Sequence, residues 1–403
     1  MSSIAVPRIG ATDRQESLRP LALAAPLLLL LLFSFGAPIV GLLSRAVYEP
    51  TIANALPRTA VALGQDGGAG VPAEPVFVAF AADLKQAQAA GAVPEFAKAL
   101  NTRLPGARSQ VLRLARIAAQ DQATGKEAVI KAAPLLGEAQ SWAAIRTGTH
   151  RFTTFYLLSA FDLRWTEQGT IGAVPAEQAV FLRVFGRTFL IATIVTLATL
   201  ALGFPLAYVI TNLRPAIAGV VLVLVLLPFW TSILVRTAAW TVILQKFGLL
   251  NDLLLWLGLT SDRLELMYSR TGLIIAMTHI QLPFTLLPIY SVMRTVQPSQ
   301  LRAAQSLGGR PFTVFRRVYL PQVLPGVLAG CLLTFILCLG YYITPVLIGG
   351  ASDQLISNFI ANYVNVELNW EMAAALSFVL LASTLGLYVT MTRYLGLDLF
   401  KMG

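Results

Sequence analysis

Six apolar stretches, each long enough to cross a lipid bilayer, constrain this 403-residue chain more than any other feature of its sequence. A membrane-spanning helix needs about 20 predominantly apolar residues. The stretches are residues 21–43, 188–211, 216–235, 271–292, 324–347 and 372–392. They predict an all-α polytopic membrane protein with six transmembrane helices.

The composition supports this interpretation. Hydrophobic residues make up 56% of the chain and charged residues 12%, against about 25% charged in soluble domains. So few charges cannot cover the surface of a soluble protein of this size, which excludes a soluble enzyme, a nucleic-acid binder and a disordered scaffold. The net charge of +10 instead fits basic residues retained on the cytoplasmic side of a membrane.

Two of the apolar segments need a choice between interpretations. Residues 241–259 are interrupted by Gln245, Lys246, Asn251 and Asp252, so we expect a short re-entrant or interfacial helix there rather than a seventh span. The first stretch, 21–43, follows several arginines and resembles a signal peptide. Its apolar run exceeds the 7–15 residues of a signal-peptide core, which favours a permanent anchor.

The distribution of basic residues predicts the orientation. Six spans place both termini on one side, and the tail 1–20 and the short connections on that side carry basic residues: Arg214, Arg294, Arg302, Arg310, Arg316, Arg317, Arg393 and Lys401. The short loop between residues 347 and 372 has no lysine or arginine. The termini are therefore expected in the cytoplasm, and the block 44–187 in the periplasm.

The block 44–187 has helical composition at residues 76–100, 109–120 and 126–142, and it shows no strand-like alternation. We expect a mostly helical insert that packs on the membrane portion. A separate ligand-sensing domain is the alternative interpretation.

The sequence offers no catalytic or metal-binding constellation. The two histidines, His150 and His279, lie in different regions, so they cannot form a two-histidine metal site within one region. Gly125 and Lys126 are followed by Glu127, which breaks a phosphate-loop pattern. We therefore expect no catalytic residue, no metal and no cofactor. The spans also lack the buried charges of a proton relay, which argues against an ion-coupled pump.

The connection after the fourth span carries a helix-turn-helix pattern. Pro298 suits the first turn of a helix, Gly308 and Gly309 suit its left-handed end, and Pro311 begins a second short helix that ends near Tyr319. This pattern predicts a rigid projection on the cytoplasmic face that inserts into a groove of a partner protein.

This segment resembles the coupling loop of inner-membrane permease subunits of binding-protein-dependent ABC importers. Its matching residues are Ala303, Ala304, Leu307, Gly308, Phe315, Val318, Leu320, Pro321, Pro325 and Gly326. Arg302 stands where that family usually has glutamate. The resemblance implies that loop 297–321 couples to an ATPase through Arg302, Ala303, Ala304, Leu307, Gly308, Phe312, Phe315, Leu320 and Pro321.

Further segments are similar to spermidine/putrescine-type permeases, namely residues 227–240, 248–251, 340–345 and 349–350. The resemblance implies that 188–403 is a permease core with five spans that imports a polyamine-like solute across the bacterial inner membrane. It also implies a cytoplasmic ABC ATPase dimer that binds the ATP, a second permease subunit, a periplasmic solute-binding protein and membrane lipid as partners, and no nucleic acid. An ion-coupled secondary transporter and a membrane-anchored sensor using block 44–187 are the alternatives.

Aromatic residues gather near the outer ends of the third and fifth predicted spans. They are Phe229, Trp230, Trp240, Tyr341 and Tyr342. Their rings suit a translocation path that attracts a polyammonium solute through cation–π contacts. An interfacial aromatic belt is the alternative interpretation.

Overall fold

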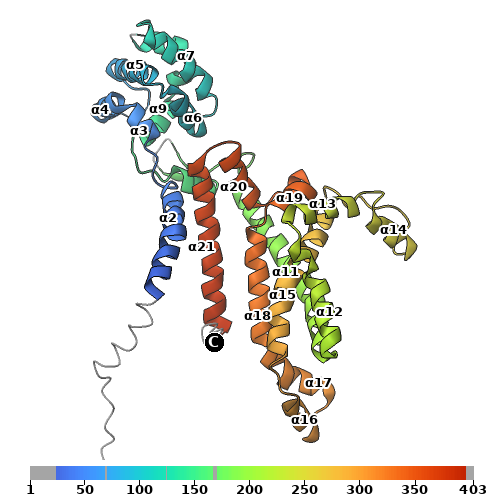
Figure 1. Cartoon of the computed structure of the whole chain (residues 1–403). Coiled ribbons are helices and arrows are strands. Elements are labelled where there is room, and N and C mark those ends of the chain that lie inside the picture. The colour runs from blue at the N-terminus through green and yellow to red at the C-terminus, as the bar shows by residue number, and fades with distance from the viewer. Residues whose placement is uncertain (1–23, 69, 124, 167–169, 396–403) are drawn as a thin grey trace, which may run out of the picture. The chain divides into compact units, whose positions relative to one another are not determined.

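The computed structural model describes residues 24–68, 70–123, 125–166 and 170–395 (Figure 1). The predicted cytoplasmic tail 1–20 and Lys401 lie outside these residues. The chain forms two compact units, Met1–Tyr156 and Leu157–Gly403. Helices dominate both units, in agreement with the all-α prediction.

The first unit begins with a membrane-spanning helix, Ala24–Ser44, which contains the π segment η1 (Leu32–Gly36) and α2 (Ala37–Ser44). None of the residues of its most apolar window is buried in the described part of the protein. Such exposure of leucines suits a helix surrounded by lipid rather than by protein. This helix corresponds to the predicted span 21–43.

The rest of the first unit is a helical domain with its own core. Its helices are α3 (Thr51–Ala55), α4 (Pro57–Asp66), α5 (Glu74–Ala89), α6 (Val93–Arg103), α7 (Ala107–Ala119), α8 (Lys126–Ala132), η2 (Pro134–Gly137) and α9 (Ala139–Gly148). Trp142 is fully buried and meets the rings of Phe77 and Phe80 edge to face, with centroids 4.8 and 5.6 Å away. Burial of such large rings supplies much of a small domain's stability.

A buried ion pair joins the chain segment that enters this domain to the end of α6. Arg103 Nη2 lies 2.6 Å from Glu49 Oε2, and the two side chains are only 1% and 2% exposed. Beside it, Glu49 N donates to Arg151 O at 2.9 Å, and Thr153 N donates to Val47 O at 2.8 Å. The domain is thus closed at its base by paired backbone segments and one ion pair.

The second unit opens with α10 (Phe155–Ala160), which the unit boundary crosses, and a short antiparallel hairpin of β1 (Leu163–Trp165) and β2 (Ile171–Ala173). The sequence showed no alternation there, because strands of three residues are too short to display a period of two. Asp162, just before β1, accepts backbone N–H groups of Val180, Phe181 and Leu182. This carboxylate caps the first spanning helix of the unit.

Three spans form the centre of the second unit: α11 (Phe181–Asn212), α15 (Arg270–Met293) and α18 (Leu320–Leu339). They pack side by side (Figure 1). Small residues allow the close approach, since a Cβ atom at Gly330 of α18 would lie 2.6 Å from Thr285 O of α15. A further span, α21 (Trp370–Leu395), follows α20 (Ile356–Asn365).

The third predicted span, 216–235, is not a straight helix. α12 (Pro215–Leu226) and η3 (Leu227–Trp230) are followed by α13 (Ile233–Ile243) after a bend of 101°. Pro228 supplies no backbone donor, and the Ser232 side chain accepts from Val235 N to start α13. The described residues hold five spanning helices, or up to six if this bent pair is one span.

The fifth predicted span also differs in detail, whereas segment 241–259 agrees with its prediction. The fifth predicted span, 324–347, is interrupted: α18 ends at Leu339, and α19 (Ile343–Ile348) is separate because the residues from Gly340 leave the helix. Segment 241–259 holds the last residues of α13 and the separate α14 (Leu249–Trp256), a short helix that cannot cross a bilayer, as predicted. The 3-10 turn η5 (Ala351–Asp353) then precedes α20.

Candidate functional site

The cytoplasmic projection predicted from the sequence begins with α16 (Pro298–Ser306). Pro298 lies in its first turn, and Gly308, with a φ of +83°, ends it in the left-handed region. A Cβ at Gly309 would lie 2.7 Å from Ala304 O, so this position also excludes a side chain. Gly308 is therefore required for its backbone conformation, whereas Gly309 is required because a side chain there would clash.

The residues of this projection fall into two groups. Leu307 and Phe312 are 90% and 73% exposed, and Arg302 and Ala303 also face outward. We call these four residues the outer face of α16, a name that includes Leu307 at the end of this helix and Phe312 in the following α17 (Pro311–Val314). Large exposed apolar side chains at the tip of a rigid turn are typical of a protein interaction surface.

The remaining predicted coupling residues connect the projection to the bundle. Phe315 packs edge to face on Phe204 of α11, with ring centroids 6.3 Å apart. Ala304 and Leu320 are half-buried, whereas Gly308 and Pro321 are exposed. The projection is thus seated on the spans.

The second helix of the pattern is not separate, contrary to the prediction. α17 (Pro311–Val314) runs through a π segment, η4 (Phe315–Tyr319), directly into α18. The residues 311–339 form one helix of 29 residues. No helix breaker stands between Val314 and Leu320, and the extra residue of a π turn lets the helix continue.

The five predicted path residues do not form one aromatic cluster. Phe229 meets Phe284 edge to face at 4.9 Å, and Trp240 Nε1 donates to His279 Nδ1 at 3.2 Å. Tyr341 is half-buried against the core, whereas Trp230 and Tyr342 are exposed. In the part of the chain that the structure describes, no ring contact joins any two of the five.

The structure adds Arg236, which the sequence interpretation did not single out, and His279, which it did not include among the path residues. The guanidinium Cζ of Arg236 lies 5.5 Å from the centroid of the Phe229 ring. Arg236 is also close enough to interact electrostatically with His279 and Tyr341. Arg236 therefore lies near two of the five predicted path residues, Phe229 and Tyr341, and near His279. Its location in the apolar segment 233–243 was the signal that could have found it.

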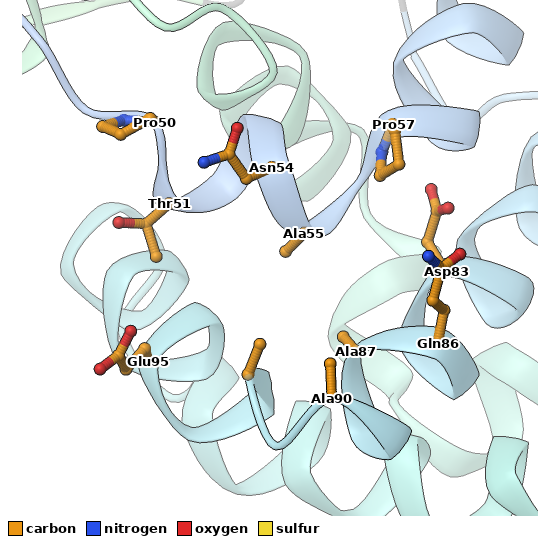
Figure 2. Close-up of a pocket in the computed structure, with 11 residues that line it drawn as sticks. Pro50, Thr51, Asn54, Ala55, Pro57, Asp83, Gln86, Ala87, Ala90 and Glu95 are labelled. Atoms are coloured by element: carbon orange, nitrogen blue, oxygen red, sulfur yellow. The ribbon is translucent and has the colours of Figure 1, made fainter.

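The first unit holds a separate pocket of about 340 Å³ between α3, α5 and the start of α6 (Figure 2). Its most buried polar wall residue is Asp83. Both carboxylate oxygens of Asp83 accept hydrogen bonds at the start of α4, from Arg58 N, Thr59 N and Thr59 Oγ1. This carboxylate caps the start of α4, so both of its oxygens already accept hydrogen bonds from the protein itself.

Among the described residues, no group of three or more histidine, cysteine, aspartate or glutamate side chains could hold a metal ion. Cys331 and Cys338 are free thiols on the same helix. The geometry of the second unit is that of a helical bundle with the projection at one end and the short helices α13 and α19 at the other (Figure 1).

Comparison with known proteins places this geometry in context. Residues 169–395 match the family described as "Binding-protein-dependent transport system inner membrane component". The chain is 34% identical over 202 residues to the spermidine/putrescine transport system permease protein PotB of Escherichia coli, covering 50% of this chain and 73% of that protein. It is 31% identical to the inner membrane ABC transporter permease protein YdcU of Escherichia coli, covering 60% and 81%.

A bacterial alginate ABC transporter in complex with an alginate pentasaccharide-bound periplasmic protein is a distant structural neighbour, with a TM-score of 0.44, 19% identity, and coverage of 53% and 79%. That likeness is too distant to carry a conclusion. Most of block 44–187 lies outside the family match, which begins at residue 169. By the extent of that match, the chain belongs to the binding-protein-dependent transport system inner membrane components: it is a multi-pass permease subunit of an ABC importer, in which separate subunits hydrolyse ATP.

Proposed function

We propose that this permease imports a small organic amine, and that a cytoplasmic ATPase dimer drives it through the outer face of α16. The observation that carries the coupling proposal is the exposure of Leu307 and Phe312 on a turn whose backbone is fixed by Gly308. A protein partner that covers both side chains removes their apolar surface from water, and this burial contributes favourable binding free energy.

The continuity of the projection with a span supports transmission of movement. α17 passes into α18 without a break, and Phe315 packs against Phe204. A displacement of α16 by the ATPase therefore moves a spanning helix rather than a flexible loop. ATP binding then biases the permease between two arrangements by favouring one of them.

The proposed orientation places both termini and α16 in the cytoplasm and the helical domain of the first unit in the periplasm. Arg294, Arg302 and Arg310 near the projection support it, as does the absence of lysine and arginine from residues 348–371. A second permease subunit, identical or different, completes the path, and a periplasmic binding protein delivers the solute. For the helical domain of the first unit, two alternative roles are proposed: an insert that packs on the membrane portion, or a domain that senses a ligand.

The solute class is proposed from two observations. The relative PotB is named for spermidine and putrescine transport, and the rings of Phe229 and Trp240, which suit ammonium groups, lie against Phe284 and His279 of α15. Each ring face contributes about 0.5–2 kcal/mol to an ammonium contact. That is enough to favour passage of an amine, while selection among amines falls to the binding protein.

Replacement of Gly308 by proline tests the coupling. Proline fixes φ near −65°, which is incompatible with the +83° at this position. Gly308→Pro is expected to abolish solute-stimulated ATP hydrolysis and uptake by the assembled importer while the permease still inserts. Gly258→Pro is the matched control, because Gly258 has a φ of +66° in the link after α14, away from α16. Normal coupling in Gly308→Pro, or equal loss in both variants, would contradict the proposal.

A further inference from the structure

Arg236 carries a charge in the second unit that no described acidic residue balances. Its Nη2 donates a long 3.4 Å bond to Thr231 O, and its Nε is buried with no hydrogen-bond partner. The ion pairs among the described residues of this unit join Lys246 to Glu265, Arg263 to Asp252 and Arg270 to Asp353. A guanidinium offers five N–H donors, so most of its binding capacity is unused in the isolated chain.

His279 adds a second donor beside Arg236. Trp240 Nε1 donates to His279 Nδ1 at 3.2 Å. Because Nδ1 accepts, the ring proton of this imidazole is assigned to Nε2, which therefore acts as a donor. The His279 side chain is exposed on α15. Arg236 and His279 together form a group of donors with no described carboxylate to receive them.

The position of these donors along the helices argues for a functional role. His279 lies nine residues after Arg270, the first residue of α15, which corresponds to about 14 Å along a helix of about 36 Å. His279 therefore lies well within its spanning helix, and Trp240, one helical turn after Arg236 on α13, reaches it. Charged groups at that depth are costly in lipid and face a bundle interior or an aqueous path.

Two short helices that each follow a helix interruption pack against each other. One interruption is the 101° bend between α12 and α13, and the other separates α18 from α19. The hydroxyls of Thr237 on α13 and Thr344 on α19 lie 3.2 Å apart and join the two. Irregular backbone at membrane depth occurs where protein buries it or where it lines water. The donors and the interruptions thus point to one solute-facing region.

We propose that Arg236 and the His279 Nε2–H bind an oxyanion, carboxylate or phosphonate, carried by the solute. The inference rests on the proposed import function and narrows its solute class to organic amines that also bear an acid group. The ammonium end then meets the ring of Phe229 or Tyr341, while the oxyanion meets the guanidinium. A simple diamine would instead bring a second positive charge next to Arg236 with no counter-charge.

Putrescine and 4-aminobutyrate form a matched pair of probes, because the second replaces one ammonium end of a four-carbon diamine by a carboxylate. ATP-driven uptake of each is measured in proteoliposomes that contain the complete importer. The wild-type importer is expected to carry 4-aminobutyrate, Arg236→Gln to lower that uptake at least tenfold, and Arg236→Lys to lower it less. Arg263→Gln is the control, because Arg263 also lies over a ring, that of Phe247 at 5.0 Å, but is paired with Asp252.

Several outcomes would overturn the inference. One is that the wild-type importer takes up putrescine but not 4-aminobutyrate. Another is that Arg236→Gln lowers the uptake of both amines equally. Either result would leave the import function intact. A lipid phosphate is the other source of an oxyanion, so the assay is repeated in vesicles of digalactosyldiacylglycerol, which has no phosphate. Loss of the Arg236→Gln effect in those vesicles would assign the site to lipid. Absence of ATP-driven uptake of either amine would contradict the import proposal as well.

Discussion

The hydroxyl oxygens of Thr285 and Thr334 lie 2.6 Å apart where α15 packs against α18. Thr285 also donates to Thr199 of α11 at 2.8 Å, and all three residues are fully buried. Apolar side chains give helices little reason to associate in lipid, because the lipid tails are equally apolar. A chain of hydroxyls across three spans therefore helps to fix which helix faces pack together.

Replacement of Thr285 by valine is expected to destabilise this packing, because valine keeps the shape of threonine and removes the bridging hydroxyl. Interhelical hydrogen bonds of this kind contribute about 0.6–2 kcal/mol. Thermal unfolding of the purified permease in detergent measures the change. Thr193→Val is the control, because the Thr193 hydroxyl bonds only to Phe189 O of its own helix. Equal destabilisation by both variants would contradict an interhelical role.

Gly330 is predicted to tolerate no side chain. A Cβ there would lie 2.6 Å from Thr285 O, so α15 and α18 would have to separate. Gly330→Ala is expected to lower the yield of folded permease and its unfolding temperature sharply. Gly386→Ala on α21 is the matched control, since a Cβ there meets nothing within 4 Å. Its higher helix propensity is expected to stabilise α21 by about 1 kcal/mol. Wild-type stability of Gly330→Ala would show that the spans are less closely packed than described.

The buried pair of Arg103 and Glu49 leads to a prediction for the helical domain of the first unit. Glu49→Gln leaves the buried guanidinium uncompensated, at an expected cost of about 3–5 kcal/mol. Limited proteolysis of the full-length protein should then cleave this domain faster. Asp121→Asn serves as the control, since its pair with Lys85 is exposed and contributes about 0–1 kcal/mol. Unchanged proteolysis in Glu49→Gln would mean that the base of the domain is held by its backbone pairing alone.

The sequence predicted the spans better than their ends and bends. The fourth predicted span, 271–292, agrees closely with α15 (Arg270–Met293), because apolar length alone defines it. α11 starts seven residues before the predicted 188, since Asp162, far back in the chain, caps it. The bend after Trp230 depends on how Pro228 and Ser232 are accommodated in three dimensions, which apolar length does not encode.

The same distinction holds for the candidate sites. The end of α16 at Gly308 follows from a local pattern of proline and glycine, so the sequence was sufficient to predict it. Arg236 falls just after the third predicted span, which ends at residue 235, so the sequence did not single it out. Its approach to His279, on a helix more than forty residues away, is set by packing between helices. No residue spacing could have shown that contact.

The orientation of the permease is open to a direct labelling test. Ser109 on α7 and Ser299 on α16 are both exposed, so single cysteines at these positions should react with a thiol reagent that does not cross the membrane. The native Cys331 and Cys338 are first replaced by alanine. In intact spheroplasts, Ser109→Cys is expected to react and Ser299→Cys to react only after the membrane is opened, because the arginines near α16 favour its retention in the cytoplasm. Labelling of both cysteines from outside would mean that the bent pair α12 and α13 does not act as one span, and that α16 cannot meet a cytoplasmic ATPase.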